Sequence, residues 1–166
     1  ARRVLTVSQH AAWEVRTAFG LLEERVTVVP SGVSETLRRL AAQLPQGKGG
    51  ETSEAPRPYI LYAGLLTARK GVLTLLDAFE RLRESGWAGY LVLTGLQGSD
   101  YATVAKKMAS SAYGEDIVLK GAVDDATLAR LYASASVFCL PSFHEGFGLT
   151  VLEAMTFGCP VVASDC

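Results

Sequence analysis

The chain has 166 residues, with 16 lysines and arginines against 17 aspartates and glutamates. This near-balance of charge, without a run of one sign, argues against a protein that binds nucleic acid or a charged membrane surface. The apolar runs are far shorter than a membrane-spanning helix requires, and the length suffices for one domain with a sizeable core.

The first segment predicts a strand, a helix and a second strand. Ser8 can cap the helix and Gly20 can end it. We interpret residues 1–32 as the tail of an amino-terminal domain of a longer protein. The expected strands cover residues 3–7 and 25–29, and the helix covers residues 9–19.

Residues 33–58 are interpreted as the connection to the rest of the chain. A short helix is expected over residues 34–44, because three leucines recur there at helical spacing. The stretch 45–58 is rich in Gly, Pro, Ser, Glu and Lys, which predicts a flexible linker.

From Tyr59 onward, apolar strands alternate with helical patterns. Buried strands separated by helices predict an α/β fold with a Rossmann-like, doubly wound parallel sheet. Residues 59–166 would form this domain and hold five of its six strands. Strands are expected over residues 59–63, 90–94, 116–119, 137–140 and 160–163, with helices over residues 72–83, over residues 101–111 and from a cap at Asp124 or Asp125 to Ala133.

The segment after residues 137–140 carries the strongest functional signal. Pro141 ends the strand because proline has no N–H for the sheet. Glu145 follows, just before the loop Gly146-Phe147-Gly148. A helix N-terminus behind a glycine loop is suited to bind a phosphate. The helix after the loop is expected to bury one face, formed by Leu149, Leu152 and Met155, and to stop at Gly158.

A second loop, after residues 59–63, carries Arg69 and Lys70. In a doubly wound sheet, ligands bind beyond the carboxyl ends of the strands, where the strand order reverses. We therefore expect both cations to share a crevice with Glu145 and to bind a diphosphate there. The alternative is that both are solvated loop charges. The loop lacks the Walker sequence Gly-x4-Gly-Lys-Ser/Thr.

The sequence Glu145-Gly-Phe-Gly-Leu-Thr-Val-Leu-Glu153-Ala-Met, with seven residues between the glutamates, resembles the signature of retaining, nucleotide-sugar-dependent glycosyltransferases of family 4, group 1. The likeness extends from Leu131 to Asp165. It implies the GT-B fold of two Rossmann-like domains. This chain would hold the end of the acceptor domain and most of the donor domain.

The resemblance also implies roles for individual residues. Glu145 would contact the transferred sugar or its phosphate, Glu153 the ribose hydroxyls, and Lys70 the donor diphosphate. Glu145 and Lys70 would be the catalytic residues. Leu65 stands where many members carry an arginine, and Arg69 would supply that cation instead. The other donor-binding residues implied are Gly64, Val123 in a base-binding loop, and Gly146, Phe147, Gly148 and Leu149.

The two histidines receive no role in this site. His10 is expected to be a partly exposed helix residue, and His144 is expected to be structural. No carboxylate cluster demands a metal, and the family needs no obligatory metal or cofactor. The three cysteines lack metal-ligand spacing; we expect Cys139 and Cys159 to be small buried hydrophobes in a reducing compartment.

The implied reaction moves a sugar from a nucleoside-diphosphate donor to an acceptor hydroxyl, with retention of anomeric configuration. By analogy with the family alone, the Arg-Lys loop suggests a GDP-mannose-like donor, and a UDP-sugar stays open. The acceptor would be a glycan, a lipid-linked or a small molecule, as in polysaccharide synthesis. We expect a cytoplasmic enzyme without a nucleic-acid partner, and any peripheral membrane association would lie in the missing N-terminal part.

Two other classes stay open. One is a different GT-B sugar-nucleotide enzyme, such as a synthase or an epimerase, and the other is a non-catalytic nucleotide-sugar-binding module. A hydrolytic pair of carboxylates is disfavoured, because Glu153 lies well inside a helix. The 166-residue chain alone is expected to lack transferase activity.

Overall fold

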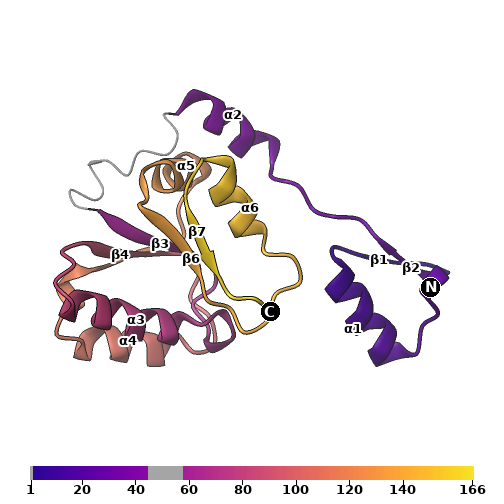
Figure 1. Cartoon of the computed structure of the whole chain (residues 1–166), viewed down its shortest axis with the longest axis horizontal. Coiled ribbons are helices and arrows are strands. Elements are labelled where there is room, and N and C mark those ends of the chain that lie inside the picture. Colours follow the sequence, from indigo (N-terminus) through magenta and orange to yellow (C-terminus); the bar gives the residue numbers. More distant parts are fainter. Residues whose placement is uncertain (1, 45–57) are drawn as a thin grey trace.

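The structure is a computed structural model that describes residues 2–44 and 58–166. Its strands form a two-stranded sheet near the N-terminus and a five-stranded sheet in the rest of the chain. Figure 1 shows the two sheets as separate units, with a long connection and the helix α2 (Glu35–Gln43) between them.

The N-terminal unit is built as the sequence predicts. Strands β1 (Val4–Thr6) and β2 (Val26–Val28) pair in parallel, and helix α1 (Gln9–Phe19) connects them. The Ser8 hydroxyl accepts a hydrogen bond from the Ala11 N–H at 3.0 Å, and Gly20 ends the helix in the left-handed conformation. A short 3-10 turn, η1 (Glu23–Arg25), leads into β2.

Helix α2 confirms the short helix expected after this unit, and its buried Leu37 and Ala41 pack toward α5 and α6. The predicted linker lies outside the described residues over positions 45–57. The domain boundaries therefore stay predictions.

The second sheet is entirely parallel, with the order β5-β4-β3-β6-β7. This order confirms the doubly wound fold, and it places the reversal between β3 and β6. The strands are β3 (Tyr59–Ala63), β4 (Tyr90–Thr94), β5 (Ile117–Gly121), β6 (Val137–Leu140) and β7 (Val161–Ala163).

Helices cover both faces of the sheet (Figure 1). One layer holds α3 (Val72–Glu84) and α4 (Tyr101–Ser110), and the other holds α2, α5 (Asp125–Ser134) and α6 (Leu149–Thr156). Two 3-10 turns, η2 (Ala68–Lys70) and η3 (Gly114–Asp116), precede α3 and β5. Apolar side chains fill the core between the layers. Leu61, Leu91 and Phe138, for example, are each 0% exposed.

The buried face of α6 differs from the sequence prediction. Leu149 is 40% exposed and Met155 is 60% exposed, whereas Ala154 and Phe157 are fully buried. Phe157 stacks on Tyr132 of α5, with ring centroids 5.7 Å apart. Ala154 and Phe157 are turned inward because this orientation lets the Phe157 ring stack on Tyr132. The spacing of the leucines alone does not reveal this contact.

Gly71 lies at a close contact between the loop after β3 and the loop after β6. It has φ 69°, and a Cβ atom at this position would lie 1.8 Å from the Pro141 carbonyl oxygen. Only glycine allows both the left-handed backbone and this contact. The loop after β3 is thereby pressed against the loop after β6.

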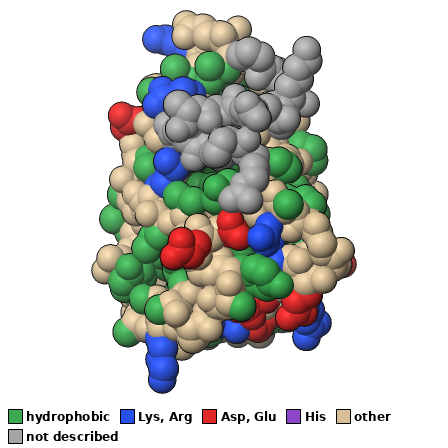
Figure 2. Space-filling view, turned by 90° about the vertical axis from the view of Figure 1, so that its left-hand side faces the viewer, with side chains coloured by type: hydrophobic (Ala, Val, Ile, Leu, Met, Phe, Trp, Pro, Cys, Tyr) green, Lys and Arg blue, Asp and Glu red, His purple; other side chains and the backbone are tan. Residues whose placement is uncertain are grey.

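Charged side chains are dispersed over the surface. On the face shown in Figure 2, acidic and basic groups alternate with hydrophobic ones. Within residues 2–44 and 58–166, no helix combines the length and the apolar character needed to span a bilayer.

We predict that Gly71→Ala destabilises the fold by about 2–4 kcal/mol, from left-handed backbone strain together with overpacking against Pro141. Gly121→Ala is the matched control, because Gly121 has φ 64° but no atom within 4 Å of its Cβ position. Urea unfolding measures both variants. Equal losses in the two variants would contradict the proposed close contact.

Candidate functional site

The loops after β3 and β6 meet at the point where the strand order reverses. The two strands are neighbours, with Leu61 paired to Phe138. The Phe143 N–H donates to the Arg69 carbonyl at 2.9 Å, and Arg69 Nη1 donates to the His144 carbonyl at 2.7 Å. These two bonds join the loops in both directions. Arg69 therefore reaches the crevice, as predicted, but its guanidinium holds backbone there.

Lys70 and Glu145 form the central ion pair of the site. Lys70 Nζ lies 2.5 Å from Glu145 Oε1, and both side chains are 17% exposed. The Ser142 hydroxyl donates to the same carboxylate oxygen at 2.6 Å, and Ser142 itself is buried. Lys70 and Glu145 lie 75 positions apart in the sequence and form a charge-assisted hydrogen bond in a largely buried environment. Such bonds are stronger than those between neutral groups.

The environment of Glu145 favours its charged form. Burial alone would raise the pKa of Glu145. The hydrogen bonds from Lys70 and Ser142 and the charges of Lys70 and Arg69 outweigh burial, and the pKa falls below its usual value. The nearby Tyr62 hydroxyl responds in the opposite way: burial, and then the charge of Glu145, raise its pKa far above the ordinary value. Glu145 is therefore a carboxylate and Tyr62 a neutral donor at neutral pH.

Glu153 has a different partner. The Tyr132 hydroxyl donates to Glu153 Oε2 at 2.9 Å, and Tyr132 is fully buried. Burial raises the pKa of Glu153, the bond from Tyr132 lowers it in part, and the charge of Asp125 raises it further. Tyr132 satisfies one carboxylate oxygen, so Glu153 has a fixed orientation.

A hollow of about 190 Å³ opens at the carboxyl ends of β3, β4 and β5. Two predicted donor-binding residues, Gly64 and Val123, line it together, and Thr150 of α6 closes one side. Glu153 follows Thr150 by three positions and so lies on the same face of α6, one turn along. The hollow is completed by Ala63, Thr94, Gly95, Leu96, Ala122 and Leu128.

Three of the remaining predicted residues line a different hollow beside the α6 N-terminus. Glu145, Phe147 and Gly148 border a second hollow of about 210 Å³, together with Ser142. Gly146 instead faces the N-terminal unit, with its Cβ position 3.8 Å from Val7. Leu149 points outward and is 40% exposed. Five residues of the predicted set are thus divided between two hollows, and the others line neither.

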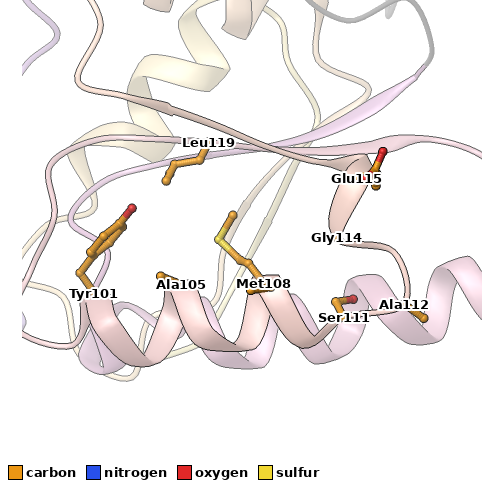
Figure 3. A pocket seen from close by; sticks show the side chains of 9 residues that line it. Tyr101, Ala105, Met108, Ser111, Ala112, Gly114, Glu115 and Leu119 are labelled. Atoms are coloured by element: carbon orange, nitrogen blue, oxygen red, sulfur yellow. The ribbon is translucent and has the colours of Figure 1, made fainter.

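A hollow larger than these two lies elsewhere. Figure 3 shows it, with Tyr101 and Met108 rising from α4 toward Leu119 of β5. Its volume is about 490 Å³, and Glu115 is its one charged lining residue. It sits at the outer edge of the sheet, away from the ion pair, and it brings no convergent polar groups together. We therefore place the candidate site at the strand reversal.

Comparisons with known proteins identify the family of this chain. The family model described as "Glycosyl transferases group 1" matches residues 48–166. The chain belongs to this family. The matched region contains all of the five-stranded sheet and both loops of the candidate site.

Curated relatives and a solved structure of similar fold align with nearly the whole chain. O-antigen chain mannosyltransferase B of Escherichia coli is 33% identical over 99% of this chain and 44% of its own length. MMP alpha-(1->4)-mannosyltransferase of Mycolicibacterium hassiacum is 34% identical over 97% of this chain and 36% of its own length. The structure of Anabaena HepE in complex with UDP and glucose aligns with a TM-score of 0.77 at 21% identity, over all of this chain and 45% of that one. The chain thus spans less than half the length of these relatives, and it shares the GT-B fold.

Sequence reasoning missed the partners that orient Glu145 and Glu153. Ser142 was visible as a polar residue between Pro141 and Phe143, three positions before Glu145, but nothing indicated that it is buried. Tyr132 lies 21 positions before Glu153 and reaches it only because α5 packs on α6. Thr150 has no feature in the sequence that predicts its place at the hollow lined by Gly64 and Val123.

We predict a pH-dependent role of Glu145 in stability. At pH 7, Glu145→Gln should lower the free energy of unfolding by about 1–3 kcal/mol, because Lys70 loses its charged partner. The folded pKa of Glu145 is lowered, so its contribution is complete above the unfolded value of about 4.3 and is lost as the pH falls through the folded pKa. Urea unfolding from neutral to acidic pH measures the difference between the two proteins.

Glu24→Gln, which removes an exposed carboxylate, is the control and should change the unfolding free energy little at any pH. A difference between native protein and Glu145→Gln that stays constant into the acid range would contradict the ion pair.

Proposed function

We propose that this chain binds the nucleoside-diphosphate sugar donor of a retaining glycosyltransferase, at the reversal between β3 and β6. The observation that carries the proposal is the bond between Lys70 and Glu145, just before the N-terminus of α6 and at the edge of the hollow that Glu145 lines. A cation, a carboxylate and a helix N-terminus at one place suit a substrate with a diphosphate and sugar hydroxyls.

The geometry supports one direction for the donor. The base would enter the hollow lined by Gly64 and Val123, which is largely apolar and open at the strand ends. The ribose would lie toward Glu153, one turn along α6 from Thr150. The diphosphate would cross the helix N-terminus toward Lys70, and the sugar would reach Glu145 and the hollow beyond it.

The ion pair gives the site a mechanism for exchanging partners. Without donor, Lys70 and Glu145 neutralise each other. A bound diphosphate competes with Glu145 for the ammonium group, and the freed carboxylate, still held by Ser142, can accept hydrogen bonds from sugar hydroxyls. Negative charge that develops on the leaving diphosphate during transfer would be stabilised by Lys70 and the α6 dipole.

For the donor sugar we propose mannose carried by GDP. Two relatives at 33% and 34% identity are named mannosyltransferases. The adjacent cations Arg69 and Lys70 suit the diphosphate of either donor class. HepE, whose structure holds UDP and glucose, makes a UDP-sugar the competing donor.

Transfer to an acceptor is proposed for the full protein. The described N-terminal unit consists of β1, α1, the turn η1 and β2. These short elements offer a small surface for holding an acceptor. The 166-residue chain by itself should bind nucleotide without transferring sugar.

A donor-binding screen tests this function. Calorimetry on the full protein with GDP-mannose, UDP-glucose and the free nucleoside diphosphates should give the tightest binding for the GDP compounds. Glu153→Ala should weaken binding by about 1.5–3 kcal/mol, because the ribose loses a charged acceptor. Glu115→Ala, which changes a glutamate in the outer hollow, is the control and should bind normally. Unchanged binding in Glu153→Ala would remove Glu153 from the site.

We also predict that Lys70→Ala lowers kcat/KM for the donor about 10- to 150-fold, and more than Arg69→Ala does. Lys70 presents its ammonium group to the site, whereas the Arg69 guanidinium is engaged by the His144 carbonyl. Steady-state kinetics of the full protein compares the two variants. Small and equal effects would make both residues structural loop charges.

A further inference from the structure

Three potential metal ligands meet where the N-terminal unit contacts the loop before α6. His10 Nε2 lies 3.7 Å from Glu14 Oε1, and His144 Nδ1 lies 3.6 Å from the same oxygen. The ligand atoms of all three residues lie within 4.8 Å of one another. His10 and Glu14 belong to α1, whereas His144 belongs to the loop before Glu145. The chain has two histidines in all, and both are here.

The spacing is close to that of a metal centre. Ligands bound at about 2.0–2.2 Å in tetrahedral geometry lie roughly 3.4 Å from one another. The two measured distances to Glu14 exceed this value by a few tenths of an ångström. The ligand atoms of His10 and His144 lie within 4.8 Å of each other, so side-chain rotations that bring the two imidazoles closer would place three ligands on one ion.

Neighbouring contacts restrain the two histidines, and the helix orients His10 and Glu14 together. His10 and Glu14 stand four positions apart, so one face of α1 presents both. Arg69 donates to the carbonyl of His144 and so fixes the backbone that carries the imidazole. The Trp13 ring stacks near His10, with centroids 6.1 Å apart.

Access from solvent is also present. The three side chains are 43%, 38% and 46% exposed, in the order His10, Glu14 and His144. An ion can therefore enter, and a water molecule can complete a fourth coordination position.

We propose that His10, Glu14 and His144 form a site for a divalent transition metal of the Zn²⁺ and Co²⁺ class. Two imidazoles and one carboxylate suit these ions, whereas Ca²⁺ and Mg²⁺ prefer sets of oxygen ligands. The bound ion links α1 to the loop that ends in Glu145. It thereby restrains the N-terminal unit against the donor-binding unit, one residue away from the Lys70–Glu145 pair.

Spectroscopic titration of the full protein with Co²⁺ tests the site. Coordination by two imidazoles and a carboxylate should give visible d–d absorption without a thiolate charge-transfer band, which separates this site from the three cysteines. His10→Asn, His144→Asn and Glu14→Gln should each weaken binding at least tenfold, since each removes a ligand. Glu24→Gln, an exposed glutamate of the same unit, is the control and should bind as the native protein does.

A second measurement uses stability. Zn²⁺ should raise the thermal midpoint of the native protein and leave that of His144→Asn unchanged, because only the native protein can bridge the two units. All variants change exposed side chains, and circular dichroism verifies that they fold. Unchanged Co²⁺ affinity in both histidine variants, absence of binding at millimolar Co²⁺, or a dominant thiolate band would each overturn the proposal.

Discussion

The bond between Lys70 and Glu145 is the interaction on which the organisation of the candidate site depends. It joins the loop after β3 to the loop after β6, where the strand order of the parallel sheet reverses. Ser142 holds the same carboxylate oxygen, so Glu145 cannot turn away when its cation moves. The absence of a side chain at Gly71 lets the two loops approach closely enough for this bond to form.

The two glutamates of the motif therefore occupy different electrostatic environments. Glu145 is held charged by a cation and a hydroxyl, and its pKa is lowered. Glu153 is half-buried beside Tyr132, and its pKa is raised. Environments that move two carboxyl groups in opposite directions generally mark different tasks. This difference fits a proposed division in which one group meets the sugar and the other the ribose.

The N-terminal unit contacts the loop that carries Glu145. Glu14 of α1 lies near His144, and Val7 lies near Gly146. Both contacts fall on the loop that leads to α6. Movement of the N-terminal unit would therefore displace the residues that flank Glu145, whether or not a metal ion is bound.

The sequence by itself determined the order of the elements, the parallel sheet and the two loops of the site. Apolar strands between amphipathic helices allow few arrangements, and the right-handed crossover places Lys70 beside Glu145. The buried face of α6, the partners Ser142 and Tyr132, and the meeting of His10 with His144 were decided only by the tertiary structure. Each of these depends on how one element packs against another that is distant in sequence, and a periodicity or a motif describes one segment at a time. The meeting of the histidines depends further on the relative placement of two units, which no local pattern in the chain records.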